Sequence, residues 1–153
     1  MNEFIGKITV IIPSYQPDGK LLEVVKGLVE KGFEDIILVD DGSGESYAPI
    51  FGEAALFKEI TLLTHPENRG KGCALKTAFD CCIKERPNCS GVVTVDGDNQ
   101  HHVDDIYACC EKNEGKTGPC DPGGEGFFCK GSAFPEPFRK CPDKRGVSFC
   151  VRH

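Results

Sequence analysis

The chain has 153 residues and a formal net charge of −6 at pH 7, and this length suits one domain with a hydrophobic core. The acidic balance argues against a general nucleic-acid-binding protein. No apolar run approaches the roughly 18–20 residues that cross a membrane, and no signal peptide is recognisable at the N-terminus, so we expect a cytoplasmic protein.

Ten cysteines are a high count for this length. No two of them form a Cys-X-X-Cys pair, which disfavours a zinc site. A disulfide framework fits poorly with the absence of a signal peptide. Half of the cysteines fall in helical-looking segments, where cysteine packs as a small apolar residue.

Predicted strands and predicted helices alternate through the first three quarters of the chain. The strands are short apolar runs rich in β-branched residues, and the helices carry apolar residues at helical spacing. In chain order they are a strand at 7–15, a helix over 21–29 that stops at Gly32, a strand at 36–40, a less regular helix over about 46–58, a strand at 60–64, a helix over about 73–85, a strand at 91–95 and a helix over about 103–112. Strand, helix and strand in succession imply parallel pairing, so the sequence predicts an α/β fold with a doubly wound, mostly parallel sheet.

Polar segments follow the carboxyl ends of all four predicted strands. They are the Pro13-Ser-Tyr segment, the pair Asp40 and Asp41, the glycine-rich loop 65–72 and the segment 96–98. Doubly wound sheets bind ligands outside the carboxyl ends of their strands. The sequence therefore predicts a nucleotide-type site at this edge of the sheet.

Asp96-Gly-Asp98 places two carboxylates around a residue that has no side chain. Hard anionic oxygens so close together suit Mg²⁺ or Mn²⁺, and such a cation suits a diphosphate. Taken alone, the same residues are equally typical of a polar turn after a strand. The metal-site interpretation depends on the other polar segments at the same edge.

Two common phosphate-binding motifs are absent from the sequence. A P-loop ending at Gly70-Lys71 would need Gly at the position of His65 and Ser or Thr at that of Gly72. A dinucleotide fingerprint built on Gly42-Ser-Gly44 would need Gly where Tyr47 stands. A dehydrogenase or a Walker-type NTPase is therefore disfavoured.

Four segments together carry a more specific signal than any of them alone. They are Val10-Ile-Ile-Pro-Ser-Tyr15, Leu38-Val-Asp-Asp-Gly-Ser43, Asn68-Arg-Gly-Lys-Gly72 with Ala74-Leu-Lys-Thr77, and Asp96-Gly-Asp-Asn-Gln-His101. In this order they resemble the family 2 glycosyltransferases with the GT-A fold, and most of all the branch that moves sugars onto polyprenyl or dolichyl phosphate. The resemblance covers residues 7 to about 112. It implies transfer of a sugar from a UDP- or GDP-sugar to a polyprenyl phosphate or a saccharide acceptor, with Mg²⁺ or Mn²⁺ as the cofactor.

The resemblance also implies a role for individual positions. These are Pro13 and Tyr15 beside the base, Asp40 at the base, Asp41 at the nucleoside, Lys71 near the nucleotide, Asp96 at the ribose and the metal, Asp98 on the metal, and Gln100 and His101 toward the sugar or acceptor. A divalent cation suits this chemistry because the departing diphosphate gathers negative charge. Each position also has a plain structural alternative, such as a strand end, a turn or a solvated surface charge.

The sequence changes character after about residue 113. We expect a nucleotide-sugar-binding domain at 1–113 and, at 114–153, an irregular or disordered tail without strands, because Gly, Pro and Cys recur there without a period. Read one base later from Pro119 onward, the possible codons permit a string that resembles the family's own continuation. Our hypothesis is that a frameshift replaced the acceptor half, and the gene's nucleotide sequence tests it.

Two alternatives to an active transferase remain. One is a non-catalytic remnant that binds nucleotide-sugars. The other is a sugar-phosphate nucleotidyltransferase on a similar sheet, which would require a Gly-rich loop after the first strand. The segment Pro13-Ser-Tyr-Gln-Pro17 stands there instead.

Overall fold

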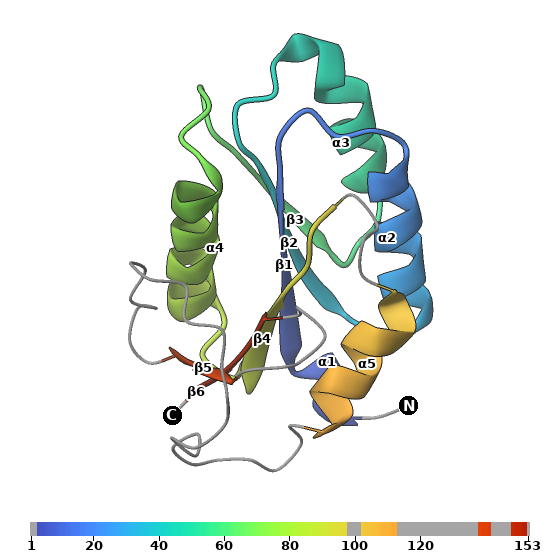
Figure 1. The fold of residues 1–153 in the computed structure, drawn as a ribbon, viewed down its shortest axis with the longest axis vertical. Helices are drawn as coiled ribbons and strands as arrows, with labels where there is room; N and C mark the ends of the chain where they lie inside the picture. The colour runs from blue at the N-terminus through green and yellow to red at the C-terminus, as the bar shows by residue number, and fades with distance from the viewer. Residues whose placement is uncertain (1–2, 98–101, 113–137, 142–147, 153) are drawn as a thin grey trace.

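The computed structural model describes residues 3–97, 102–112, 138–141 and 148–152. Their strands form one sheet in the order β3-β2-β1-β4-β6-β5 (Figure 1). The strands are β1 (Ile8–Ser14), β2 (Asp35–Asp40), β3 (Ile60–Thr64), β4 (Gly91–Thr94), β5 (Phe138–Cys141) and β6 (Ser148–Arg152). The helices are α1 (Glu3–Gly6), α2 (Lys20–Glu30), α3 (Ala48–Ala54) after a 3₁₀ turn at Glu45–Tyr47, α4 (Lys71–Glu85) and α5 (Val103–Lys112).

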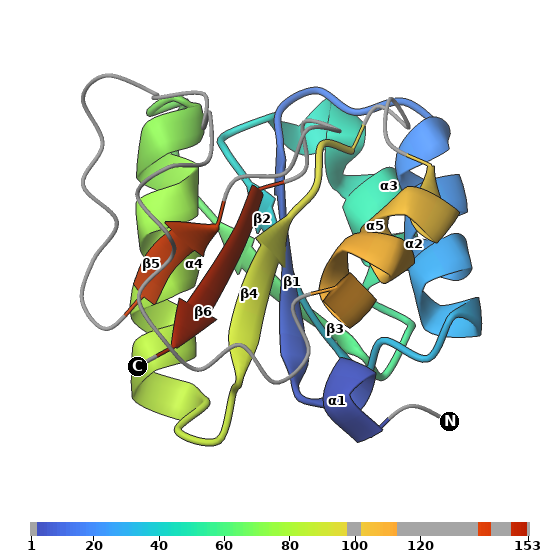
Figure 2. The ribbon, with the colours of Figure 1, turned by 60° about the horizontal axis from the view of Figure 1, so that its bottom comes forward.

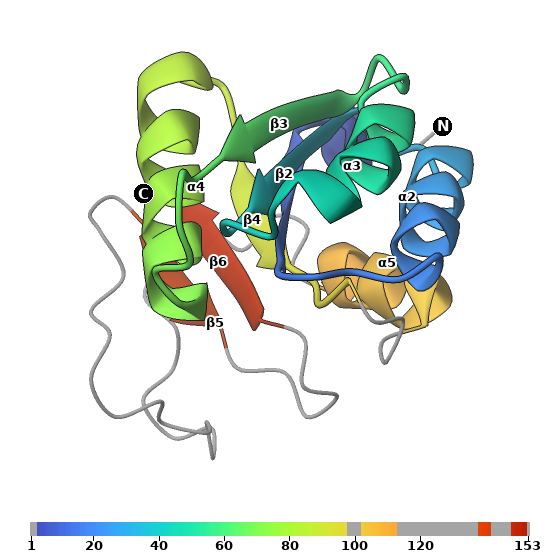
Figure 3. The same cartoon turned by 90° about the horizontal axis from the view of Figure 1, so that it is seen from above.

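The first four strands are parallel, as the sequence predicts. β1 lies between β2 and β4, and β3 pairs with the outer side of β2. Helices cover both faces of this sheet: α4 lies alone on one side, and α2, α3 and α5 lie on the other (Figure 3). Because parallel strands are buried on both faces, their sequences are apolar almost without interruption.

Alternate residues of β1 contribute to two separate hydrophobic clusters. Val10 and Ile12 join the cluster with α2, while Ile11 joins the cluster with Ala78 and Phe79 of α4. This alternation follows from the two-residue period of a strand. The two clusters hold the strand ends in fixed positions, and these ends carry the polar segments.

Two of the predicted helices, α3 and α4, differ from their predicted bounds by two residues or more, and α1 was not predicted. α3 is shorter than the predicted 46–58, and Pro49 lies in its first turn, where its missing N–H costs no hydrogen bond. α4 begins at Lys71, two residues earlier than expected, directly after Gly70, which has a φ of 93°. The left-handed backbone at Gly70 separates the preceding loop from the helix.

The tail contains two strands where the sequence predicted none. β6 pairs antiparallel with β4, and β5 pairs antiparallel with β6, so both lie beside β4 in the same sheet (Figure 2). The local composition of these residues gave no sign of the two strands. A strand can instead be selected by the unpaired edge of a neighbouring strand, here β4.

None of the described helices has both the length and the apolar composition that crossing a membrane requires.

Candidate functional site

A cavity of about 410 Å³ opens at the carboxyl ends of β1 and β4. Its walls come from three stretches that are far apart in the sequence: residues 13–18, Lys71, and the pair Asp96 and Gly97. The predicted site residues Pro13, Tyr15, Lys71 and Asp96 are all part of the lining. The structure therefore brings these four together, at the edge of the sheet where the strand order predicts a ligand site.

Tyr15 presents its side chain to solvent at the cavity. It is 51% exposed, although it directly follows a strand that is buried along nearly its whole length. The next residue, Gln16, has a φ of 48°, an uncommon conformation for a residue with a side chain. The Gln16 N–H donates to Ser43 Oγ over 2.9 Å and so holds the turn in this form. Neither Gln16 nor Ser43 was given a role at the site from the sequence, because their contact joins two loops that are 27 residues apart.

Lys71 and Asp96 form an ion pair in the cavity. Lys71 Nζ lies 2.6 Å from Asp96 Oδ1, and the two side chains are 61% and 36% exposed. Lys71 is the first residue of α4, and Asp96 follows β4, so 25 residues of sequence separate the partners. An ion pair this exposed adds little stability, and both groups remain accessible to a ligand.

The chemistry of Asp96 fits a divalent cation. Its carboxylate is a hard oxygen ligand that lines the cavity and already faces the positive charge of Lys71. Within the part of the chain that the structure describes, no group of three or more His, Cys, Asp and Glu side chains converges on one point. The second predicted metal ligand, Asp98, lies outside the described residues, as do Gln100 and His101.

Asp41 holds the loop that leads into α4. Asp41 is 3% exposed, and its carboxylate accepts hydrogen bonds from the backbone N–H groups of Arg69 at 3.0 Å and Gly70 at 2.9 Å. His65 Nδ1 lies 2.8 Å away, and Asn68 Nδ2 donates over 3.3 Å. Burial alone raises the pKa of this carboxyl, but the bonds from Arg69, His65 and Gly70 outweigh burial and lower the pKa. These contacts account for Asp41 without a ligand, and its predicted contact with the nucleoside stays a prediction.

The same loop is fixed at two further points. A Cβ atom on Gly42 would lie 2.2 Å from the backbone carbon of Glu67, so only glycine permits this close approach. His65 Nε2 lies 2.9 Å from Thr77 Oγ1 and ties the loop to α4. Together with Asp41, these contacts set where α4 begins and therefore where Lys71 enters the cavity.

The side chain of Asp40 makes a hydrogen bond within its own loop. It is buried, and its Oδ1 accepts the Ser43 N–H over 2.9 Å. It is not among the described residues that line the cavity. The geometry of the cavity therefore does not test the predicted contact between Asp40 and the base. The partner that the structure shows for the Asp40 carboxylate is the Ser43 N–H.

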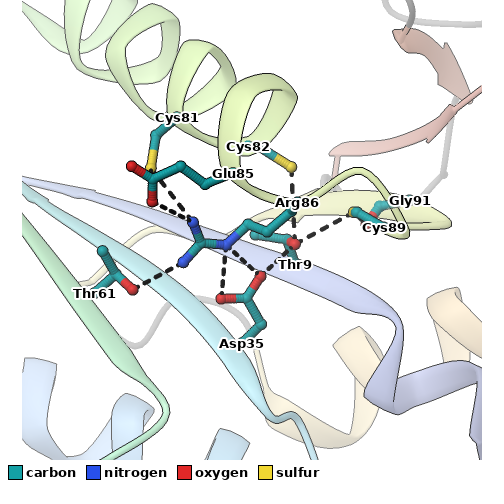
Figure 4. Close-up of polar contacts among 9 residues, drawn as sticks. All are labelled: Thr9, Asp35, Thr61, Cys81, Cys82, Glu85, Arg86, Cys89 and Gly91. Atoms are coloured by element: carbon teal, nitrogen blue, oxygen red, sulfur yellow. Dashed lines mark hydrogen bonds and ion pairs between the residues drawn. The ribbon is translucent and has the colours of Figure 1, made fainter.

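A separate polar network lies at the opposite, amino ends of the strands (Figure 4). Arg86, just after α4, donates from Nε to both carboxylate oxygens of Asp35, at 3.0 and 2.8 Å, and from Nη2 to Thr61 Oγ1 at 2.8 Å. Thr9 Oγ1 donates to Asp35 over 2.6 Å and lies 3.3 Å from the Cys89 sulfur. The network joins α4 to β1, β2 and β3 and is remote from the cavity.

The fold defines the class of protein. Solved structures of TarS from S. aureus share it, with TM-scores of 0.51 for residues 1–349 and 0.52 for the same residues in complex with UDP-GlcNAc. In both comparisons the sequences are 21% identical over 69% of this chain, and the match covers 32% and 31% of the TarS 1–349 chain respectively. The chain thus has the GT-A fold of glycosyltransferases.

The family follows from the sequence match. The model of glycosyl transferase family 2 matches residues 9–117, and the chain belongs to this family. MJ1222, an uncharacterised protein of Methanocaldococcus jannaschii, is 32% identical over 100 residues, which are 65% of this chain and 39% of that protein. The UDP-N-acetylglucosamine–dolichyl-phosphate N-acetylglucosaminyltransferase of Methanococcus voltae is 29% identical over 112 residues, covering 65% of this chain and 44% of the relative. The chain spans less than half the length of either relative.

Proposed function

We propose that this chain binds the nucleotide end of a UDP- or GDP-sugar and forms the donor site of an enzyme that transfers the sugar to a polyprenyl phosphate. The observation that carries the proposal is the convergence of Tyr15, Lys71 and Asp96 in one cavity. Two comparisons support it: the Methanococcus relative is named for a dolichyl-phosphate acceptor, and one TarS structure holds UDP-GlcNAc.

Each of the three side chains suits one part of such a donor. The exposed ring of Tyr15 offers a stacking surface for a base. The Lys71 ammonium offsets phosphate charge, and Asp96, with Asp98 as the predicted second ligand, would hold Mg²⁺ or Mn²⁺. The cation would offset the charge that develops on the departing diphosphate. A lipid phosphate acceptor is already ionised, so the chain needs little general-base assistance and acts mainly by orienting the donor.

The first test is calorimetric titration of UDP and of GDP, each with and without Mn²⁺. We expect at least one of them to bind the wild-type chain only when Mn²⁺ is present, and Asp98→Ala to abolish this metal dependence. Asp80→Ala is the matched control, because it removes an exposed aspartate from α4, away from the cavity lining, and is expected to bind like the wild type. A chain that circular dichroism shows to be folded but that binds neither nucleotide would contradict the proposal.

Lys71 gives a second prediction about the same site. We expect Lys71→Met to lower the affinity for UDP or GDP roughly three- to tenfold, and that for the free nucleoside much less, because the ammonium would interact with the phosphates. Lys76→Met removes another exposed lysine from α4 and serves as the control. Titrations at two salt concentrations provide the measurement, since the Lys71 contribution weakens as salt increases. An equal loss for nucleoside and nucleotide would show that Lys71 does not face the diphosphate.

A further inference from the structure

The hydroxyl of Ser14 is buried without a hydrogen-bond partner. Ser14 is the last residue of β1, is 7% exposed and belongs to the cavity lining. Among the residues that the structure describes, its Oγ is the only buried side-chain nitrogen or oxygen that makes no hydrogen bond. Folded proteins rarely leave such a group unpaired, because it has lost its water without gaining another partner.

Ser14 is in contact with Gly97 and with the backbone of Asp41. A Cβ atom on Gly97 would lie 3.0 Å from Ser14 Oγ and 3.1 Å from Leu21 Cδ1, so Gly97 packs directly against the hydroxyl. The backbone is fixed, because Ser14 O accepts the Asp41 N–H over 2.9 Å. Rotation about Cα–Cβ moves the hydroxyl between staggered positions and is the remaining freedom. Since the residue lines the cavity, a ligand there is the partner within reach of such a rotation.

We propose that Ser14 binds a ribose hydroxyl of the nucleotide, an inference that rests on the function proposed above. Tyr15 is the aromatic part of the cavity, and Lys71 and Asp96 are its charged part. Ser14 precedes Tyr15 in the chain and touches Gly97, the neighbour of Asp96, so it lies between the two parts. In a nucleoside diphosphate the ribose likewise joins the base to the phosphates. A serine hydroxyl both donates and accepts, which matches a neutral sugar hydroxyl.

The test compares two buried serines, of which only Ser43 has a hydrogen-bonded hydroxyl. Ser43 is 6% exposed, nearly the same as Ser14, but its hydroxyl accepts the Gln16 N–H. We expect Ser14→Ala to leave the melting temperature unchanged or to raise it, and Ser43→Ala to lower it by roughly 2–4 °C. In titrations with Mn²⁺ and whichever of UDP and GDP the wild type prefers, Ser14→Ala is expected to weaken binding roughly five- to thirtyfold.

Deoxy analogues identify the group that Ser14 contacts. With either the 2′-deoxy or the 3′-deoxy nucleotide, the penalty of Ser14→Ala should largely disappear, because the sugar hydroxyl is then already missing. The assignment is overturned by an unchanged affinity, by the same penalty with both analogues, or by a melting temperature that falls as it does in Ser43→Ala. A wild-type chain that binds neither UDP nor GDP would instead refute the proposed function itself.

Discussion

Asp41→Asn is expected to lower the free energy of unfolding by roughly 3 kcal/mol, the cost of leaving several buried donors poorly paired. The carboxylate accepts hydrogen bonds on both oxygens, including the N–H groups of Arg69 and Gly70. An asparagine keeps one oxygen and turns an NH₂ group toward donors, so at least one backbone N–H loses its partner. Urea unfolding at pH 7 measures the loss. Nucleotide affinity should fall as well, because the same loop positions Lys71 at the start of α4.

The neighbouring aspartate provides the control for this prediction. Asp40 is also buried, but the bond it accepts from the Ser43 N–H can be made equally well by an asparagine oxygen. We therefore expect Asp40→Asn to cost less than about 1 kcal/mol. Equal losses of unfolding free energy in Asp41→Asn and Asp40→Asn would show that the contacts of Asp41 with the loop do not stabilise the fold.

The stability of the wild type should depend on Asp41 in acid. The pKa of Asp41 in the folded chain is lower than the ordinary 3.8, so the folded chain binds fewer protons than the unfolded chain in this range. Its contribution is fully present above pH 3.8 and is lost as the pH falls below that value toward the folded pKa. Asp41→Asn should remove this part of the acid dependence, which urea unfolding across a pH series would detect.

The sheet could be predicted from the sequence because its cause is visible there. Segments such as Ile36–Val39 are apolar at every position, as is expected of strands covered on both faces. The placement of Lys71 and Asp96 at one edge followed from the topology alone. β6 was not predicted because its partner strand, β4, is more than 50 residues away in the sequence.

The individual roles at the site were harder to predict, for a physical reason. An aspartate at a strand end has the same appearance in the sequence whether it faces a ligand or its own chain. The donors that engage Asp41 come from Arg69 and Gly70, 28 and 29 residues away. Ser14 lies within the Pro13-Ser-Tyr segment, but the sequence cannot show that its hydroxyl is buried and makes no hydrogen bond.

The frameshift hypothesis stays a prediction that the family match does not test. The match ends at residue 117, two residues before Pro119, where the shifted frame begins to resemble the family. Sequencing the gene is the direct test. A shifted frame that closes early or encodes an unrelated segment would contradict the hypothesis.

Arg86→Met is expected to lower the free energy of unfolding by about 2 kcal/mol without affecting nucleotide binding. The substitution removes a two-oxygen contact with Asp35 and the bond to Thr61, and it leaves a half-buried carboxylate held by Thr9. The loss is smaller than for a fully buried pair because the Asp35 side chain is 26% exposed, and water replaces part of the lost contact. Urea unfolding measures the loss.

A double-mutant cycle separates the Arg86–Asp35 interaction from the packing of the arginine stem. If the pair matters, Arg86→Met combined with Asp35→Asn should be less damaging than the sum of the two single changes, because the unpaired charge is gone. Lys7→Met removes an exposed ion pair with Glu3 and should leave the urea midpoint unchanged. Additive losses in the cycle would mean that Arg86 stabilises the amino ends of the strands through its bond to Thr61 and its apolar stem, not through Asp35.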